Sequence, residues 1–97
     1  MMTKWIEFTV QAVDIHSFNA ALIVLEKASQ KEDGCVDYRV FQSTDESTLF
    51  TVFESWATEE DFEAHRVASH TNMFKEQCGV MIISKRALTL NPLLKGD

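Results

Sequence analysis

Residues 53–70 hold the side chains of this sequence that are best suited to proton transfer. Glu54 and Trp56 stand two positions apart, and His65 and His70 follow within the same stretch. Carboxylates and imidazoles are the usual general acids and bases of enzymes, because their surroundings can bring their pKa values near neutrality. Their usefulness depends on whether the fold brings them together and shields them from water.

Glu54 is expected to lie in an apolar row. Residues two apart on a strand face the same side, so Glu54 shares a face with Phe50, Val52 and Trp56. Two interpretations stay open. The carboxylate either reaches solvent at the strand end, since carboxylates are seldom buried without a partner, or it is buried with a raised pKa and takes part in proton transfer.

The two histidines differ in their expected placement. His65 follows Phe62 by three positions, so on a helix both lie on the face that meets the core. Its ring is either held by a backbone carbonyl or by Glu54, or it is a base active near neutral pH. If the helix continues, His70, five residues further on, lies about 140° round it, so the two histidines would not share a face; the alternative is that His70 ends this helix or caps the next one. This spacing predicts no metal site.

The elements around these residues follow from periodicity. Apolar alternation and β-branched or aromatic residues predict four strands, over residues 4–13, 35–42, 48–56 and 80–90. Asp14 is expected to cap a first helix that ends before Gly34, and Thr58 to cap a second, followed by a short helical segment over 71–78. The order β-α-β-β-α-β predicts an α+β, ferredoxin-like fold, with the helices on one face of a four-stranded antiparallel sheet.

The sheet is expected to be apolar on both faces. Trp5 and Val13 oppose the main apolar row of the first strand, and strict alternation divides the last strand into two apolar sets, Val80, Ile82, Leu88 and Leu90 against Met81, Ile83 and Ala87. Two helices cover only one face, and a large exposed apolar patch usually marks an interface. We therefore expect a homodimer that packs sheet against sheet.

Composition narrows the class of protein. The 97 residues predict a single domain over 1–97, with a core over about 4–90 and a C-terminal tail over 91–97. The net charge of −6 argues against a nucleic-acid partner. No apolar run approaches a membrane span, no secretory leader is expected, and two isolated cysteines favour a cytoplasmic location. The three glycines form no phosphate-binding loop, so no nucleotide cofactor is expected.

Two stretches, KEDGCVDYRVF and FTVFESWATEEDFEAHRVASHTNMF, resemble the antibiotic biosynthesis monooxygenase family. The pattern is a Glu-x-Gly-Cys start to the second strand, a tyrosine, a Glu-x-Trp, an Ala-His on a helix and a Ser-His-x-x-x-Phe segment. The resemblance spans about residues 4 to 90. The matching positions are Glu32, Gly34, Cys35, Tyr38, Glu54, Trp56, Ala64, His65, Ser69, His70 and Phe74.

The resemblance implies a dimeric α+β barrel of two ferredoxin-like subunits. It also implies a cofactor-independent monooxygenase that oxidises a small electron-rich aromatic, of the quinol or anthrone type, with O₂. In that family role His65 is the base or a hydrogen-bond donor to the substrate, and Glu54 orients it or relays the proton. The substrate-binding residues are Tyr38, Trp56, His70 and Phe74.

Other functions of the same family remain open. One is an isomerase of a small phosphorylated diketone or sugar-like signal molecule, which would need a basic residue in the pocket; Arg39 and Arg66 are the candidates. A second is a non-catalytic, dimeric ligand-binding module. The haem-degrading branch places a ligand histidine near the position of Cys78, so this substitution argues against haem.

Overall fold

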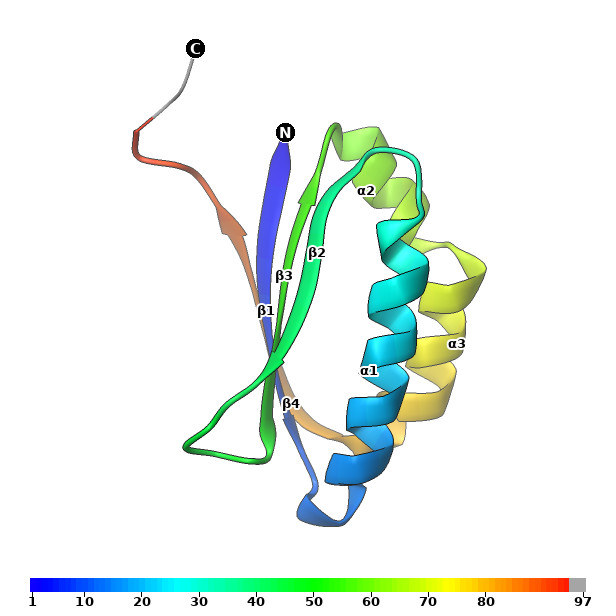
Figure 1. Ribbon diagram of the computed structural model, residues 1–97, viewed down its shortest axis with the longest axis vertical. Helices are drawn as coiled ribbons and strands as arrows, with labels where there is room; N and C mark the ends of the chain where they lie inside the picture. Colours follow the sequence, from blue (N-terminus) through cyan, green and yellow to red (C-terminus); the bar gives the residue numbers. More distant parts are fainter. Residues whose placement is uncertain (95–97) are drawn as a thin grey trace.

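The computed structural model describes residues 1–94 and contains a four-stranded antiparallel sheet (Figure 1). The strands are β1 (Met2–Val10), β2 (Cys35–Gln42), β3 (Leu49–Trp56) and β4 (Ile82–Leu90), in the spatial order β2-β3-β1-β4. The first strand is therefore central and pairs with β3 on one side and β4 on the other. Both neighbours of β1 lie far from it in sequence, which is the strand arrangement of the split βαβ unit.

Three α-helices cover one face of this sheet, and Figure 1 shows the opposite face without a covering element. They are α1 (Ile15–Gln30), α2 (Glu59–Arg66) and α3 (Ser69–Cys78), with short 3₁₀ turns η1 (Ala12–Asp14) and η2 (Gly79–Met81). The predicted ferredoxin-like α+β class is confirmed. In the described residues no helix is both long and apolar enough to pass through a bilayer.

Several predicted boundaries shift. The first strand ends at Val10 instead of residue 13, because η1 follows, and Asp14 makes no side-chain capping bond. The Thr58 cap is confirmed, since its hydroxyl accepts a hydrogen bond from the Asp61 amide at 3.1 Å. Residues 80 and 81 belong to η2, so the last strand begins at Ile82. Of the predicted tail, residues 95–97 lie outside the described residues.

The predicted alternation of the last strand is wrong in one respect. Ile82 pairs with Val10 and packs against the core, whereas Leu88 pairs with Trp5 on the opposite face. The register between β1 and β4 shifts between Thr9 and Val10, and such an irregularity moves later side chains to the other face. It also turns Lys85 toward the helices, opposite Phe8.

Four phenylalanines fix the distance between sheet and helices. Phe18 of α1 lies 5.0 Å from Phe50, 5.5 Å from Phe8 and 5.6 Å from Phe74, measured between ring centroids. Edge-to-face and tilted pairs of this kind add about 0.5–1.5 kcal/mol each beyond the apolar area they bury. The cluster fills one part of the inter-layer space, and a cavity remains beside it.

Candidate functional site

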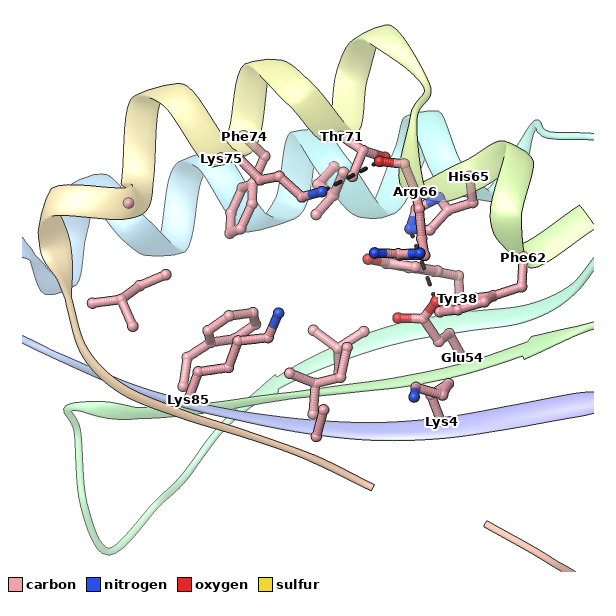
Figure 2. Close-up of a pocket in the computed structure, with 17 residues that line it drawn as sticks. Lys4, Tyr38, Glu54, Phe62, His65, Arg66, Thr71, Phe74, Lys75 and Lys85 are labelled. Atoms are coloured by element: carbon pink, nitrogen blue, oxygen red, sulfur yellow. Dashed lines mark hydrogen bonds and ion pairs between the residues drawn. The ribbon is translucent and has the colours of Figure 1, made fainter. Parts of the chain in front are cut away.

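The cavity lies between the sheet and the helices and has a volume of about 480 Å³ (Figure 2). Its wall is mainly apolar and draws on both layers, with Ile6, Phe8, Val52, Phe62, Phe74 and Ile82 among the lining residues. Glu54 and His65 also line it, and Figure 2 shows them approaching each other from the sheet and from α2. An apolar cavity with a few convergent polar groups is the usual form of a small-molecule site.

Glu54 is buried, with 2% of its surface exposed, so the solvated interpretation is wrong. Its Oε1 accepts a hydrogen bond from Trp56 Nε1 at 2.8 Å. Burial raises the pKa of Glu54, and the Trp56 hydrogen bond, then the charges of His65, Lys4 and Lys85, oppose that rise. The alternation of side chains along β3 predicted correctly that this carboxylate shares a face with Trp56, and that face is buried between the sheet and the helices.

His65 is buried between two aromatic rings and two carboxylates. Its imidazole stacks on the Trp56 indole at 4.6 Å between centroids, and Tyr38 lies 5.4 Å away. Its Nε2 lies 3.8 Å from Glu54 Oε1, and its Nδ1 lies 2.6 Å from Glu32 Oε2. Each ring nitrogen therefore faces a different carboxylate.

Glu32 is the residue of this site that the sequence reasoning did not select. It lies in the turn between α1 and β2, and its Oε2 also contacts His70 Nε2 at 2.7 Å. The available signal was the Glu-x-Gly of the family pattern, because no periodicity constrains a turn residue. Gly34 keeps this turn tight with φ of +80°, a conformation that glycine adopts readily.

The two histidines meet because α2 and α3 are separate helices. Val67 and Ala68 interrupt the helix, and Ala68 is extended, with ψ of 151°. The argument against a metal assumed a continuous helix, and that premise is wrong. Donor atoms of Glu32, His65 and His70 lie within 4.8 Å of one another, a set that can hold a metal ion. The absence of a metal stays a prediction.

The predicted substrate-binding residues divide into two groups. Tyr38 and Phe74 line the cavity. Trp56 is fully buried behind Glu54 and His65, so it contacts the site through those two residues. His70 does not line this cavity; together with Met73 it lines a separate surface depression.

Positive charge gathers around the cavity although the chain is acidic. Lys4, Arg66, Lys75 and Lys85 all line it, and Figure 2 shows their side chains around the space between the layers. Arg66 also pairs with Glu63 at 2.9 Å, and Arg39, the other predicted cation, lies on the outer face of the sheet, over Phe53. The cavity is therefore suited to a ligand that carries or develops negative charge.

Thr71 adds an unused hydrogen-bonding group to the cavity wall. Its residue is 7% exposed, and among the described residues its hydroxyl has no hydrogen-bond partner. Buried hydroxyls are nearly always paired in folded proteins, so an unpaired one at a cavity points to a ligand or water partner. Cys78 offers no comparable function, because it is fully buried, does not line the cavity, and burial raises the pKa of its thiol.

The layered α+β fold and the cavity lined by Glu54 and His65 place the chain in a class of small ferredoxin-like proteins with a cavity between sheet and helices. The profile of the antibiotic biosynthesis monooxygenase family matches residues 1–77. The chain therefore belongs to the antibiotic biosynthesis monooxygenase family, as its motifs predicted. No curated protein matches the chain.

Solved structures share this fold at low sequence identity. A protein from Nitrosomonas europaea superposes with a TM-score of 0.92 at 20% identity, over 97% of this chain and 100% of its own. PA3566 from Pseudomonas aeruginosa gives 0.91 at 22% identity, over 96% and 94%. Rv0793 from Mycobacterium tuberculosis gives 0.89 at 21% identity, over 99% and 98%. At such identities the likeness establishes the fold and no particular substrate.

Proposed function

We propose that residues 1–97 act as one catalytic domain, a cofactor-independent monooxygenase that oxidises a small electron-rich aromatic of the quinol or anthrone type with O₂. One observation carries the proposal: a buried imidazole, His65, reaches an apolar cavity with a carboxylate beside each ring nitrogen. His65 is the proposed base, and Glu54 is its proton-transfer partner. We keep the cytoplasmic location as a prediction.

The chemistry begins with loss of a proton from the substrate to His65 Nε2. The resulting anion is electron-rich enough to reduce O₂ directly. In an anthrone, the reacting CH₂ becomes C=O: one oxygen atom bonds to carbon, and the other leaves as water with the two displaced hydrogens. The CH₂ carbon supplies all four electrons that reduce O₂, two for the oxygen bound to carbon and two for the oxygen released as water, so the overall reaction balances without a further reductant.

The cavity supports each requirement of that reaction. Its mainly apolar wall limits contact between the anion and water, and its volume of about 480 Å³ lies within the range of small-molecule sites. Lys4 and Lys85 lie near enough to Glu54 to stabilise its ionised form, so they are also placed to stabilise a substrate anion. The free Thr71 hydroxyl is a further candidate to bind a substrate oxygen.

The proposal includes a homodimer formed through the uncovered face of the sheet. On that face Trp5 stacks on Phe41 at 6.5 Å between centroids, and Leu88 pairs with Trp5. Phe41 is 43% exposed and Leu90 39% exposed, which leaves apolar surface for a partner. Sedimentation velocity at micromolar concentration should give a dimer for the parent and a monomer for Leu88→Arg. A monomeric parent would remove this part of the proposal.

An oxygen electrode tests the catalytic proposal. The purified protein is assayed against anthrones, hydroquinones and catechols, with product analysis by mass spectrometry after reaction with ¹⁸O₂. We expect O₂ uptake with one labelled oxygen atom in the product. Failure with every substrate would contradict the oxygenase and favour isomerase or binding functions.

The charge around the cavity favours a second candidate, an isomerase of a small phosphorylated diketone or sugar-like molecule. Arg66, one of the two cations predicted for such a substrate, lines the cavity together with three lysines. His65 would then move a proton within the substrate and no O₂ would be consumed. Turnover of a phosphorylated ketone under anaerobic conditions, followed by NMR, would favour this candidate over the oxygenase.

A further inference from the structure

One oxygen atom of Glu32 binds both histidines of the site. Its Oε2 lies 2.6 Å from His65 Nδ1 and 2.7 Å from His70 Nε2. We propose that Glu32 is a positioning residue: it fixes the tautomer and orientation of His65, and His70 holds Glu32 in place for that task. The effect of Glu32 on turnover rests on the proposed function, whereas its effect on the tautomer of His65 does not.

The tautomer follows from the chemistry of the two partners. An ionised carboxylate only accepts hydrogen bonds, so each imidazole nitrogen beside Glu32 carries the proton. His65 is then protonated on Nδ1, and in its neutral form Nε2 has a free lone pair. That nitrogen is the one on the Glu54 side of the ring, and Glu54 lines the cavity. Glu32 thus leaves the basic nitrogen available to a substrate.

The same arrangement stabilises the product of proton transfer. When Nε2 takes a proton, the imidazolium lies against the Glu32 carboxylate at hydrogen-bond distance. A carboxylate that orients a histidine and stabilises its cation, without itself accepting the proton, is the function of the acidic residue in Ser-His-Asp triads. Glu54 is a poorer candidate for this function, because burial raises its pKa and its oxygen lies 3.8 Å from the ring.

His70 restrains Glu32 from the other side. The His65 and His70 rings are 6.0 Å apart between centroids, with the carboxylate oxygen bonded to both. A glutamate side chain loses much conformational freedom when it is held in one rotamer, so a second hydrogen bond favours the productive geometry. His70 therefore acts through Glu32, which accounts for its position outside the cavity lining.

The first experiment needs no substrate. Long-range ¹H–¹⁵N NMR of the histidine side chains distinguishes the Nδ1–H from the Nε2–H tautomer, and the exposed His16 is an internal reference. We expect His65 of the parent in the Nδ1–H form at alkaline pH. Glu32→Ala removes the acceptor and should abolish the preference for that form, while the exposed Glu76→Ala should leave it unchanged. An Nε2–H tautomer in the parent, or the same His65 tautomer in Glu32→Ala, would overturn the proposal.

The second experiment uses turnover, once a substrate is known. Glu32→Gln should lower kcat by about 10- to 1,000-fold with little change in KM, because it changes the base and not the cavity. Glu32→Asp should recover part of the loss, and His70→Gln should cause a smaller loss of the same kind. A Glu32→Gln variant that folds normally and keeps the parent kcat would contradict a positioning function. If the parent itself shows no turnover, the proposed function fails and the NMR result still decides the tautomer.

Discussion

The two carboxylates beside His65 belong to different parts of the fold. Glu54 projects from the middle of the sheet, is 2% exposed and is bonded to the indole of Trp56. Glu32 lies in a turn, partly exposed, and is bonded to two imidazoles. The same side-chain type is therefore buried in an apolar layer on one side of the ring and held in a polar cluster on the other.

This difference fits the two carboxylates to the two tasks proposed for them. The apolar surroundings of Glu54 favour its protonated form, which suits a group that shares or relays a proton. The carboxylate of Glu32 is partly exposed and lies at hydrogen-bond distance from two imidazole nitrogens, which suits orientation of a base. Under the proposed function, proton exchange belongs to Glu54 on the sheet side and orientation of His65 to Glu32 on the turn side.

The largest expected effect is the loss of the base between the two carboxylates. His65→Ala should reduce kcat/KM by about 10²- to 10⁴-fold, because general base catalysis contributes about that much. Steady-state O₂ uptake with the cognate quinol or anthrone measures the effect, and His16→Ala is the control. Turnover at the parent rate in His65→Ala would show that neither carboxylate acts through this ring.

The second prediction removes the partner of the sheet-side carboxylate. Trp56→Phe should lower the free energy of unfolding by about 2–4 kcal/mol, because it leaves a buried carboxylate oxygen without its donor and reduces core volume. Urea denaturation measures the change. Trp5→Phe is a matched control, since Trp5 donates to Glu7 at 3.2 Å across the same spacing on the outer face of the sheet. Equal losses of stability in Trp56→Phe and Trp5→Phe would mean that the buried Glu54 needs its indole donor no more than the outer-face Glu7 does.

The third prediction disturbs the turn-side carboxylate. A Cβ on Gly34 would lie 2.2 Å from the Asp61 carboxyl group, and the φ of +80° adds strain, so Gly34→Ala should cost about 1–3 kcal/mol of folding free energy. Gly79→Ala is the control, because nothing lies within 4 Å of its Cβ. Thermal unfolding with the NMR tautomer measurement checks both stability and the position of Glu32. An unperturbed Gly34→Ala variant would show that the turn tolerates change.

The smallest effect concerns pH. Folding raises the pKa of Glu54 above its ordinary value of 4.5, so the native state binds more protons than the unfolded chain above that pH. Stability from this group is fully present below pH 4.5 and falls as the pH rises toward the folded pKa, by about 1.4 kcal/mol per unit of pKa difference. Glu54→Gln should remove this slope in urea titrations between pH 4 and pH 7. If the stability of Glu54→Gln keeps the pH dependence of the parent, a group other than Glu54 causes that dependence.

Much of the sheet side of this comparison follows from sequence. Strand parity put Glu54 and Trp56 on one face, and helical spacing put His65 with Phe62 toward the sheet. The element order gave the fold because apolar periodicity reports which face of each element is buried. These inferences need only the regular periodicity of a strand or a helix, and β3 and α2 are regular at these residues.

The turn side depends on irregular backbone that periodicity does not report. The sequence predicted two helical segments here, but Val67 and Ala68 interrupt the helix without a glycine or proline, so the residues at which the chain turns His70 toward Glu32 were not marked. The register shift beside Val10 likewise reverses the alternation of β4 and brings Lys85 over Phe8. Such features are set by packing between distant segments, so local sequence patterns leave them undetermined.

Because Trp56 stacks on His65, the fluorescence of Trp56 depends on the protonation state of the neighbouring imidazole. An excited indole transfers an electron to a protonated imidazole in contact with it, so imidazolium quenches tryptophan fluorescence more strongly than neutral imidazole does. The rings lie 4.6 Å apart and within 29° of parallel. With Trp5 replaced by phenylalanine, emission from Trp56 would report the charge on His65 in real time.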